Sequence, residues 1–183
     1  MSALMATLEK HPSQRGWFAY ELLLHMLENE NIYLLTGDLG YGMFDIIRNT
    51  YPDRFINCGA AEQAMMGIAV GLALEGKIPF CYSITTFLLY RPFETIRNYI
   101  NHEQIPVRLI GSGRDKDYAH DGFSHWSEDA YGLFTPHNTD PLFVKAGIFN
   151  KIYHYWPDTK EEIPDIVSDM IKSDKPSFLS LRR

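Results

Sequence analysis

A carboxylate at the start of an apolar helix is the first candidate for chemistry in this sequence. Glu62 lies three residues after Gly59, and the predicted helix continues through 64–74, where every residue is apolar or glycine. One interpretation is structural, because a carboxylate in the first turn can bond a backbone N–H and favours the positive end of the helix dipole. The other is chemical, because a poorly hydrated carboxyl group can exchange a proton with a bound heterocycle.

Two later segments carry groups that could bind a small molecule. Phe87, Tyr90 and Phe93 stand three residues apart, and such rings either pack in the core or offer a flat face to a stacked ring. Asp121 and His125 lie in a segment rich in titratable residues. That segment is either a solvated charged loop or a site that holds and protonates a polar substrate near neutral pH. Three ligands with metal-site spacing are not evident, so we expect no metal site here.

Short apolar strands alternate with longer helices along the chain. Strands are predicted at 32–36, 55–57, 79–82, 107–110, 151–155 and 178–181, and helices at 17–27, 43–49, 60–74, 92–100 and from 159 onward. This alternation predicts an α/β fold whose parallel sheet is covered by helices on both faces. Ligands of such sheets bind beyond the carboxyl ends of the strands, and all three candidate segments follow predicted strands.

Length and composition narrow the class of protein. The chain has 183 residues, a size that fits one domain. Its net charge of −6 and the lack of a basic run argue against a nucleic-acid or anionic-membrane partner. Cys58 and Cys81 are too few for a disulfide framework. No signal peptide, membrane-length apolar run, phosphate-binding loop or nucleophile elbow is evident, so we expect a cytoplasmic protein.

An ordered set of short segments resembles the pyrimidine-binding domain of transketolase-like, thiamine-diphosphate-dependent enzymes. These segments are Thr36-Gly37-Asp38-Leu39, Pro52-Asp53-Arg54-Phe55, Gly59-Ala60-Ala61-Glu62-Gln63, 67–73, Thr86-Phe87, Pro106-Val107, 120–125 and Pro157-Asp158. The order of the set, rather than any one motif, carries the resemblance. It implies that residues 1–183 form a single pyrimidine-binding domain with the parallel sheet of that family.

The resemblance also implies roles for matching residues at the cofactor. Glu62 falls on the glutamate that bonds N1′ of the aminopyrimidine and promotes the tautomer whose imino group deprotonates the thiazolium C2. Phe87 falls on the motif that contacts the pyrimidine ring, and Tyr90 is the neighbouring aromatic. Asp38 matches an aspartate near the thiazolium side of the site.

On the substrate side, the resemblance implies contacts from three residues. Asp121 and His125 match a substrate-contacting pair in the family's D-G-x-[ST]-H turn, and His125 joins Glu62 as an expected catalytic residue. Arg182 falls near an arginine that binds a sugar phosphate. Gly113 stands about where the family places a further substrate-contacting histidine, and the connection from Asn138 to Tyr155 is longer than the family's usual one. The shape of the substrate pocket and its binding of a substrate phosphate are therefore expected to differ from those of the family.

Two parts of a full-length transketolase are not recognised in the sequence. They are the diphosphate-binding domain, with the G-D-G…N motif that holds Mg²⁺, and the C-terminal domain. We therefore expect a separate diphosphate-binding subunit to supply the Mg²⁺ ligands, in a hetero-oligomer with two copies of each chain. The apolar face of the 64–74 helix, where Gly67 and Gly71 permit close approach, is expected to pack on that second subunit.

The resemblance thus predicts a subunit of a split transketolase-like enzyme, active only with its partner. It would transfer a two-carbon ketol unit between sugars or sugar phosphates, using thiamine diphosphate. One alternative is a component of a thiamine-diphosphate-dependent 2-oxoacid decarboxylase or dehydrogenase. Another is a non-catalytic regulatory module, although an inactive scaffold has no physical need for Glu62, Phe87, Asp121 and His125 together.

Overall fold

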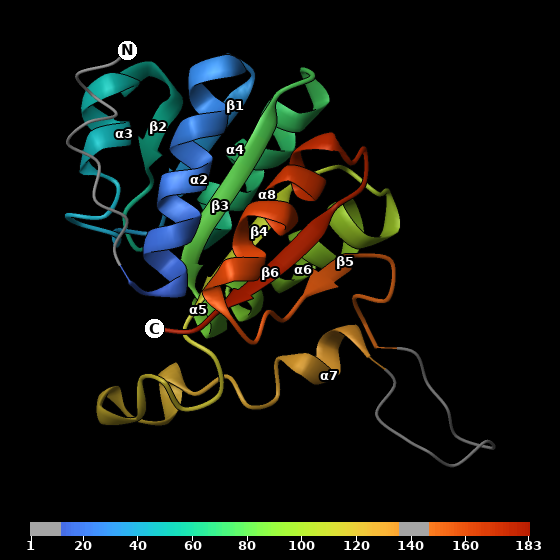
Figure 1. Ribbon diagram of the computed structural model, residues 1–183. Helices are drawn as coiled ribbons and strands as arrows, with labels where there is room; N and C mark the ends of the chain where they lie inside the picture. Colours follow the sequence, from blue (N-terminus) through green and yellow to red (C-terminus); the bar gives the residue numbers. More distant parts are fainter. Residues whose placement is uncertain (1–11, 136–146) are drawn as a thin grey trace.

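The computed structural model describes residues 12–135 and 147–183, which form a parallel six-stranded sheet in the order β2-β1-β3-β4-β6-β5 (Figure 1). Its strands are β1 (Ile32–Thr36), β2 (Phe55–Asn57), β3 (Ile78–Ile84), β4 (Arg108–Ser112), β5 (Tyr153–Tyr155) and β6 (Ser177–Leu181). Every neighbouring pair is parallel. The predicted fold class is therefore confirmed, and β1 and β2 have the predicted bounds.

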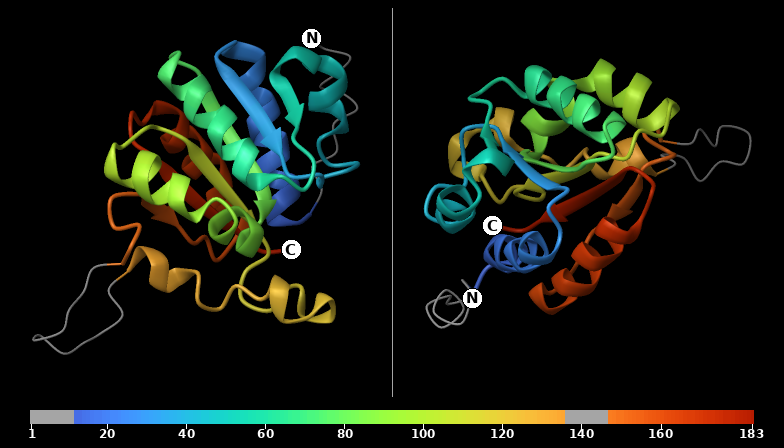
Figure 2. Two further views of the ribbon diagram at one scale, coloured as in Figure 1. Left: turned by 180° about the vertical axis from the view of Figure 1, so that it is seen from behind. Right: turned by 90° about the horizontal axis from the view of Figure 1, so that it is seen from above.

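Helices cover both faces of this sheet (Figure 2). One face carries α4 (Glu62–Leu74), α5 (Thr85–Tyr90), α6 (Phe93–Thr95) and a π-helical stretch, η2 (Ile96–His102); the other carries α2 (Gln14–Glu28) and α8 (Ile163–Lys172). The shorter elements are α3 (Asp45–Thr50), η1 (Pro52–Arg54), η3 (Ala119–Asp121), η4 (Phe123–His125), α7 (Tyr131–Phe134) and η5 (Lys160–Glu162). No helix within the described ranges is long and apolar enough to cross a membrane.

Neighbouring residues of a strand pack into two different hydrophobic layers, one on each face of the sheet. Leu35, Cys81, Leu109 and Phe178 pack under the α4 face, whereas Leu34, Phe80, Ile110 and Leu179 pack under α2 and α8. All of these side chains are fully buried. Because side chains alternate along a strand, a sheet covered on both faces requires apolar residues at consecutive positions. This requirement explains the apolar runs that predicted the strands.

Helix α5 was not predicted from the sequence. Its six residues are too few for a helical period, and it begins with two β-branched threonines that locally favour a strand. Distant backbone groups hold both hydroxyls: Thr85 Oγ1 donates to the Gly113 carbonyl at 2.7 Å, and Thr86 Oγ1 donates to the Ser124 carbonyl at 2.9 Å. Tertiary contacts therefore decide the conformation of the segment that carries Phe87.

Arg108 is a buried charged side chain that joins β4 to the end of α8. Its guanidinium donates to the carbonyls of Met170 at 2.9 Å and Ser173 at 2.6 Å, and also to that of Pro106. Burial lowers the pKa of Arg108 to about 10. These three hydrogen bonds let the sheet accommodate a charge that is only 3% exposed.

We expect Arg108→Ala to lower the free energy of unfolding by about 3 kcal/mol, because buried carbonyls lose their donors. Urea denaturation followed by circular dichroism measures this change. Arg97→Ala, at an exposed position on η2, is the control and should change stability by less than about 0.5 kcal/mol. Equal changes in the two variants would show that the Arg108 contacts do not stabilise the fold.

Candidate active site

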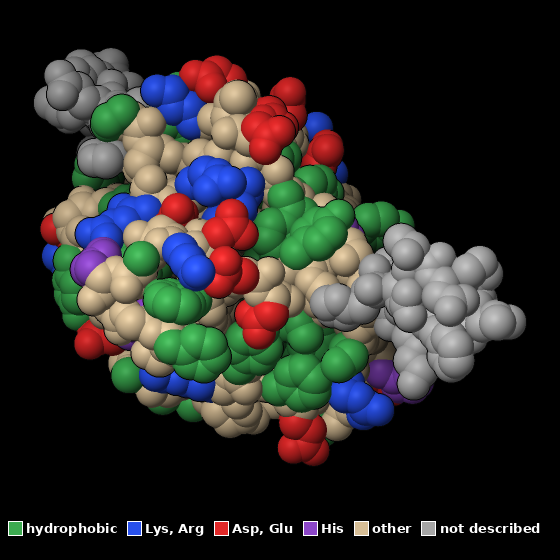
Figure 3. All heavy atoms as spheres, turned by 90° about the horizontal axis from the view of Figure 1, so that it is seen from below, with side chains coloured by type: hydrophobic (Ala, Val, Ile, Leu, Met, Phe, Trp, Pro, Cys, Tyr) green, Lys and Arg blue, Asp and Glu red, His purple; other side chains and the backbone are tan. Residues whose placement is uncertain are grey.

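The candidate site lies where the chain reverses direction across the sheet, at the carboxyl ends of β1 and β3. After β1 the chain forms β2 on one side and then crosses to form β3 on the other side of β1. Such a switch point leaves a crevice beyond the strand ends, where ligands of parallel sheets bind. Figure 3 views this end of the molecule, where hydrophobic groups are interspersed with basic and acidic side chains.

Glu62 is buried beside these strand ends and is 1% exposed. Its Oε1 accepts a hydrogen bond from Ser83 Oγ at 2.8 Å, and its Oε2 accepts one from Arg91 Nη1 at 2.6 Å. Both donors lie outside α4, so the carboxyl group is directed at the strand ends rather than at the amides of its own helix. These contacts fit the chemical interpretation of Glu62 better than the helix-capping one.

Gly37, directly after β1, lets the backbone pass close to this carboxyl group. A Cβ atom at this position would lie 2.8 Å from Ser83 Oγ and 3.0 Å from Glu62 Oε1. These distances are too short for carbon, so any side chain at position 37 would displace the hydrogen-bonded pair. Position 37 is therefore a glycine because Ser83 and Glu62 leave no room for a side chain.

Arg91 links the carboxyl group to an aromatic ring, and that ring in turn contacts an imidazole. The Arg91 guanidinium carbon lies 3.9 Å from the centroid of the Phe87 ring, while its Nη1 bonds Glu62. The His125 ring meets the Phe87 ring at a centroid distance of 4.8 Å and an interplanar angle of 68°. The structure therefore brings together Glu62, Phe87 and His125, and it adds Arg91 and Ser83, which the sequence analysis did not select.

Tyr90 lies at the end of α5 and is 38% exposed. Burial, and then a hydrogen bond with Asp129, raise the pKa of the Tyr90 hydroxyl above its ordinary value. The hydroxyl is thus engaged by the segment that follows β4. It does not contribute to the hydrogen bonds around Glu62.

Asp38 is held in an exposed turn by hydrogen bonds from Tyr41 and Asn57. Its φ of +58° is in the left-handed region, which aspartate tolerates better than most residues. The side-chain oxygen of Asn57 also accepts from the backbone N–H groups of Asp38 at 3.1 Å and Gly59 at 3.0 Å, which ties the two loops together. Hydrogen bonds from Tyr41 and then Asn57 lower the pKa of Asp38, so it remains a carboxylate.

The predicted substrate pair is split between two short turns. Gly122, with a φ of +85°, separates η3 from η4. His125 lies against Phe87, but the Asp121 carboxylate lies 3.1 Å from the His120 Nε2 atom and is largely solvated. The structure thus brings His125, and not Asp121, into contact with the residues around Glu62.

Arg182 follows β6 and faces two carboxylates on the segment after β4. Its guanidinium nitrogens lie 3.5 Å from Asp115 Oδ2 and 3.9 Å from Asp117 Oδ1. A phosphate bound to Arg182 would therefore compete with these two acidic groups.

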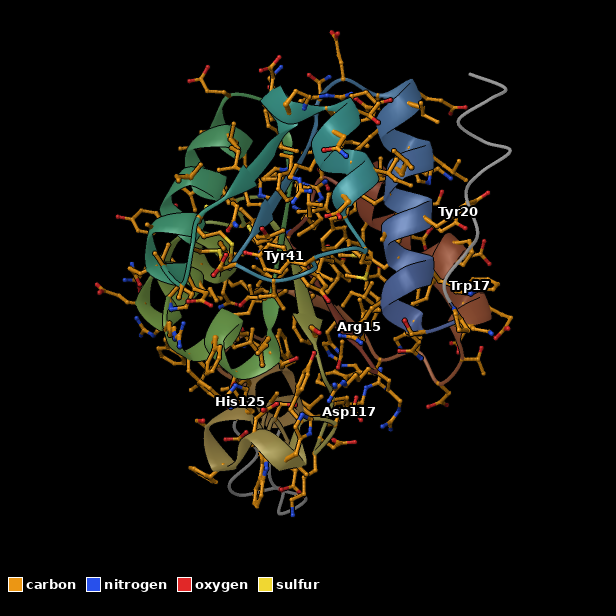
Figure 4. The ribbon with its side chains drawn as sticks, turned by 90° about the vertical axis from the view of Figure 1, so that its left-hand side faces the viewer. Arg15, Trp17, Tyr20, Tyr41, Asp117 and His125 are labelled. Atoms are coloured by element: carbon orange, nitrogen blue, oxygen red, sulfur yellow. The ribbon has the colours of Figure 1, made fainter. Side chains whose placement is uncertain are left out.

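A cavity of about 510 Å³ opens between the first turns of α2 and the loop after β1. Its lining includes Arg15, Tyr20, Tyr41 and Met43. Figure 4 shows Arg15 between Tyr41 on one side and Asp117 and His125 on the other. The cavity therefore adjoins the loop that carries Asp38 and lies apart from the hydrogen bonds of Glu62.

Arg15 connects this cavity with the residues near Glu62. Its Nη1 donates to the Tyr118 hydroxyl at 3.1 Å, and the Tyr118 ring centroid lies 6.4 Å from that of His125. Arg15 could not be selected from the sequence, because it precedes Tyr118 by 103 residues and no motif surrounds it. One signal pointed to it: Arg15 lies at the start of a helix that runs directly into β1. Because that helix and β1 run in opposite directions, the first turn of the helix lies near the carboxyl end of the strand.

Comparison with protein families shows that residues 12–183 match the model of the transketolase pyrimidine-binding domain. Among curated proteins, a putative transketolase C-terminal section of Methanocaldococcus jannaschii is 37% identical over 97 residues, covering 52% of this chain and 31% of that protein. One of the subunits of an apulose-4-phosphate transketolase of Actinobacillus succinogenes is 28% identical over 131 residues. That match covers 72% of this chain and 38% of the subunit.

Solved structures show the same fold. A split-gene transketolase, described as an inactive beta4 tetramer, superposes with a TM-score of 0.75 at 26% identity, covering 93% of this chain and 51% of that one. The transketolase of Campylobacter jejuni gives a TM-score of 0.77 at 18% identity, with 93% and 25% coverage. The matched region spans about half or less of each relative's own length.

Proposed function

Because the chain belongs to the family of transketolase pyrimidine-binding domains, we propose that it is one subunit of a split, thiamine-diphosphate-dependent transketolase. In this proposal it binds the aminopyrimidine half of the cofactor and takes part in transfer of a two-carbon ketol unit between sugars. The observation that carries the proposal is the buried Glu62 carboxylate beside the Phe87 ring, at the carboxyl ends of β1 and β3.

The contacts of Phe87 and Glu62 support an aminopyrimidine as the ligand of this site. The planar guanidinium of Arg91 lies on the Phe87 ring and donates an N–H to Glu62. One flat group can therefore stack on Phe87 and hydrogen-bond to Glu62 at the same time. An aminopyrimidine with a proton at N1′ offers the same two features. The close backbone approach at Gly37 keeps Ser83 and Glu62 in place beside it.

When bound, thiamine diphosphate supplies an electron sink for cleavage and formation of C–C bonds beside a carbonyl. The part of Glu62 is to hold a proton at N1′ of the ring. Ser83 fixes one carboxyl oxygen at 2.8 Å, and the other, which accepts from Arg91 here, would face the ring. Phe87 would supply the stacking face, Tyr90 would add a second aromatic contact to the ring, and Asp38 would contact the thiazolium side of the cofactor.

The diphosphate and Mg²⁺ are assigned to a second subunit. Within residues 12–135 and 147–183, no group of three His, Cys, Asp or Glu side chains is placed to hold a metal ion. The exposed face of α4 suits such a partner, because Gly67, Ile68, Gly71 and Leu74 are all exposed along it. We propose a hetero-oligomer with two copies of each chain, and note that the split-gene relative is described as inactive in its beta4 form.

A sugar or sugar phosphate is the proposed substrate. His125 is placed to reach a group bound beside Phe87, and Asp121 and Arg182 lie on the adjoining turns and strand end. The cavity next to Arg15 offers room for the end of a polyol that extends away from the ring. The polar side chains of Asp121 and His125 favour a polyol over a simple oxoacid.

We expect the isolated chain to bind thiamine diphosphate with Mg²⁺ more weakly than micromolar, because only half of the cofactor finds partners here. Calorimetry on the chain alone, and then with the chain that co-purifies with it from native cells, measures the difference. Addition of the partner should bring the affinity into the micromolar range or tighter. Micromolar binding by the chain alone would contradict the split-subunit assignment.

A further inference from the structure

Arg91 occupies the two surfaces that the proposed function gives to the cofactor ring. Its guanidinium lies on the Phe87 ring, with 3.9 Å between the guanidinium carbon and the ring centroid. The same group donates an N–H to Glu62 Oε2 at 2.6 Å. A planar guanidinium and a protonated aminopyrimidine thus present the same pattern, a flat face for stacking and an N–H for a carboxylate.

We propose that Arg91 is a placeholder that fills the aminopyrimidine site in the unloaded chain and must swing out before the ring binds. This inference rests on the proposed function and adds a competing group that belongs to the chain itself. The His125 ring also contacts Phe87, at an interplanar angle of 68°. A ring that both stacks on Phe87 and bonds Glu62 Oε2 takes the position of the guanidinium, so it replaces Arg91 rather than joining it.

Electrostatics give a reason for the placeholder. A carboxylate that is 1% exposed is unfavourable unless a charge or several donors balance it. Arg91 balances Glu62 while the site is unloaded. Because the Arg91 Nη1 atom lies 2.6 Å from Glu62 Oε2, a ring nitrogen can take that position only after Arg91 has left.

The position of Arg91 permits this movement. It is the residue directly after α5, and Pro92 follows it. Its side chain is 42% exposed, whereas that of Glu62 is 1% exposed. Arg91 can therefore turn into solvent without opening the core, and Phe87 and Glu62 keep their places on α5 and α4.

The test uses the free aminopyrimidine alcohol, which is the cofactor's ring without its thiazolium and diphosphate. This probe needs no second subunit, so the full chain can be studied by itself. Calorimetry should show that Arg91→Ala binds the probe about tenfold more tightly than the unmodified chain, as expected when a conformer that blocks about nine-tenths of the sites is removed. Arg97→Ala, one charge removed from an exposed site six residues later, should bind like the unmodified chain.

Further variants separate the possible outcomes. Arg91→Lys keeps a charge beside Glu62 but has no flat group, so it should also bind more tightly than the unmodified chain, and it serves if Arg91→Ala fails to fold in a thermal melt. Phe87→Ala should remove binding in either background. Weaker or equal binding by both Arg91 variants would overturn the placeholder and leave the proposed function intact. Absence of binding by the unmodified chain and all variants alike would overturn both.

Discussion

Glu62→Gln is expected to leave the assembled enzyme folded and associated but to slow exchange of the cofactor's C2 proton by about 10²-fold or more, the scale of a general acid–base contribution. Glutamine cannot share a proton with N1′, so the tautomer that removes the C2 proton loses its support. Exchange into heavy water, followed by NMR on the complex with cofactor bound, measures this step directly.

The contacts of Glu62 also predict what the same substitution does to stability. Ser83 and Arg91 each donate to one carboxyl oxygen. Glutamine offers only one oxygen, so its NH₂ group would face the Ser83 hydroxyl, which must turn from donor to acceptor. We expect a loss of about 1 kcal/mol or somewhat more in the unloaded chain. Glu75→Gln, at the exposed end of α4, is the control and should alter neither stability nor exchange. Unchanged exchange in Glu62→Gln would show that Glu62 is structural.

His125→Ala is expected to lower kcat/KM for the true substrate at least tenfold, while the affinity for the cofactor changes less. His125 lies against Phe87, so a substrate carbon bound next to the ring comes within its reach. Asp121→Ala is expected to have a smaller effect, because its carboxylate is largely solvated and pairs with His120. Even so, kcat/KM of each variant should be lower than that of the unmodified enzyme by more than about threefold.

Steady-state kinetics of the two-subunit enzyme and calorimetry with cofactor separate the two kinds of effect. His102→Ala, an exposed histidine at the end of η2, is the matched control. A change below about threefold in kcat/KM corresponds to less than roughly 1 kcal/mol of transition-state stabilisation. Such a result for His125→Ala would contradict its assigned role. A larger loss of cofactor affinity than of kcat/KM would instead assign His125 to packing against Phe87.

The sequence by itself determined the layers of this protein and the identity of its main candidate residues. Apolar residues at consecutive positions predicted strands buried on both faces, and β1 and β2 lie where that pattern places them. Glu62, Phe87 and His125 could be selected because each follows a strand, and strand ends in a parallel sheet share one edge. These are local signals, since they depend on residues a few positions apart.

Only the tertiary structure decided which of these residues meet and what else joins them. The order of the strands places Ser83 beside Glu62, and α5 turns Arg91 back onto both Glu62 and Phe87. The tertiary structure also joins Arg15 to Tyr118 across 103 residues of sequence. The physical reason is that chain crossovers and hydrogen bonds between distant segments bring such pairs together. Contacts of this kind produce no periodic pattern in the sequence. For the same reason, the sequence placed Asp121 and His125 together, whereas the turn at Gly122 directs them to different neighbours.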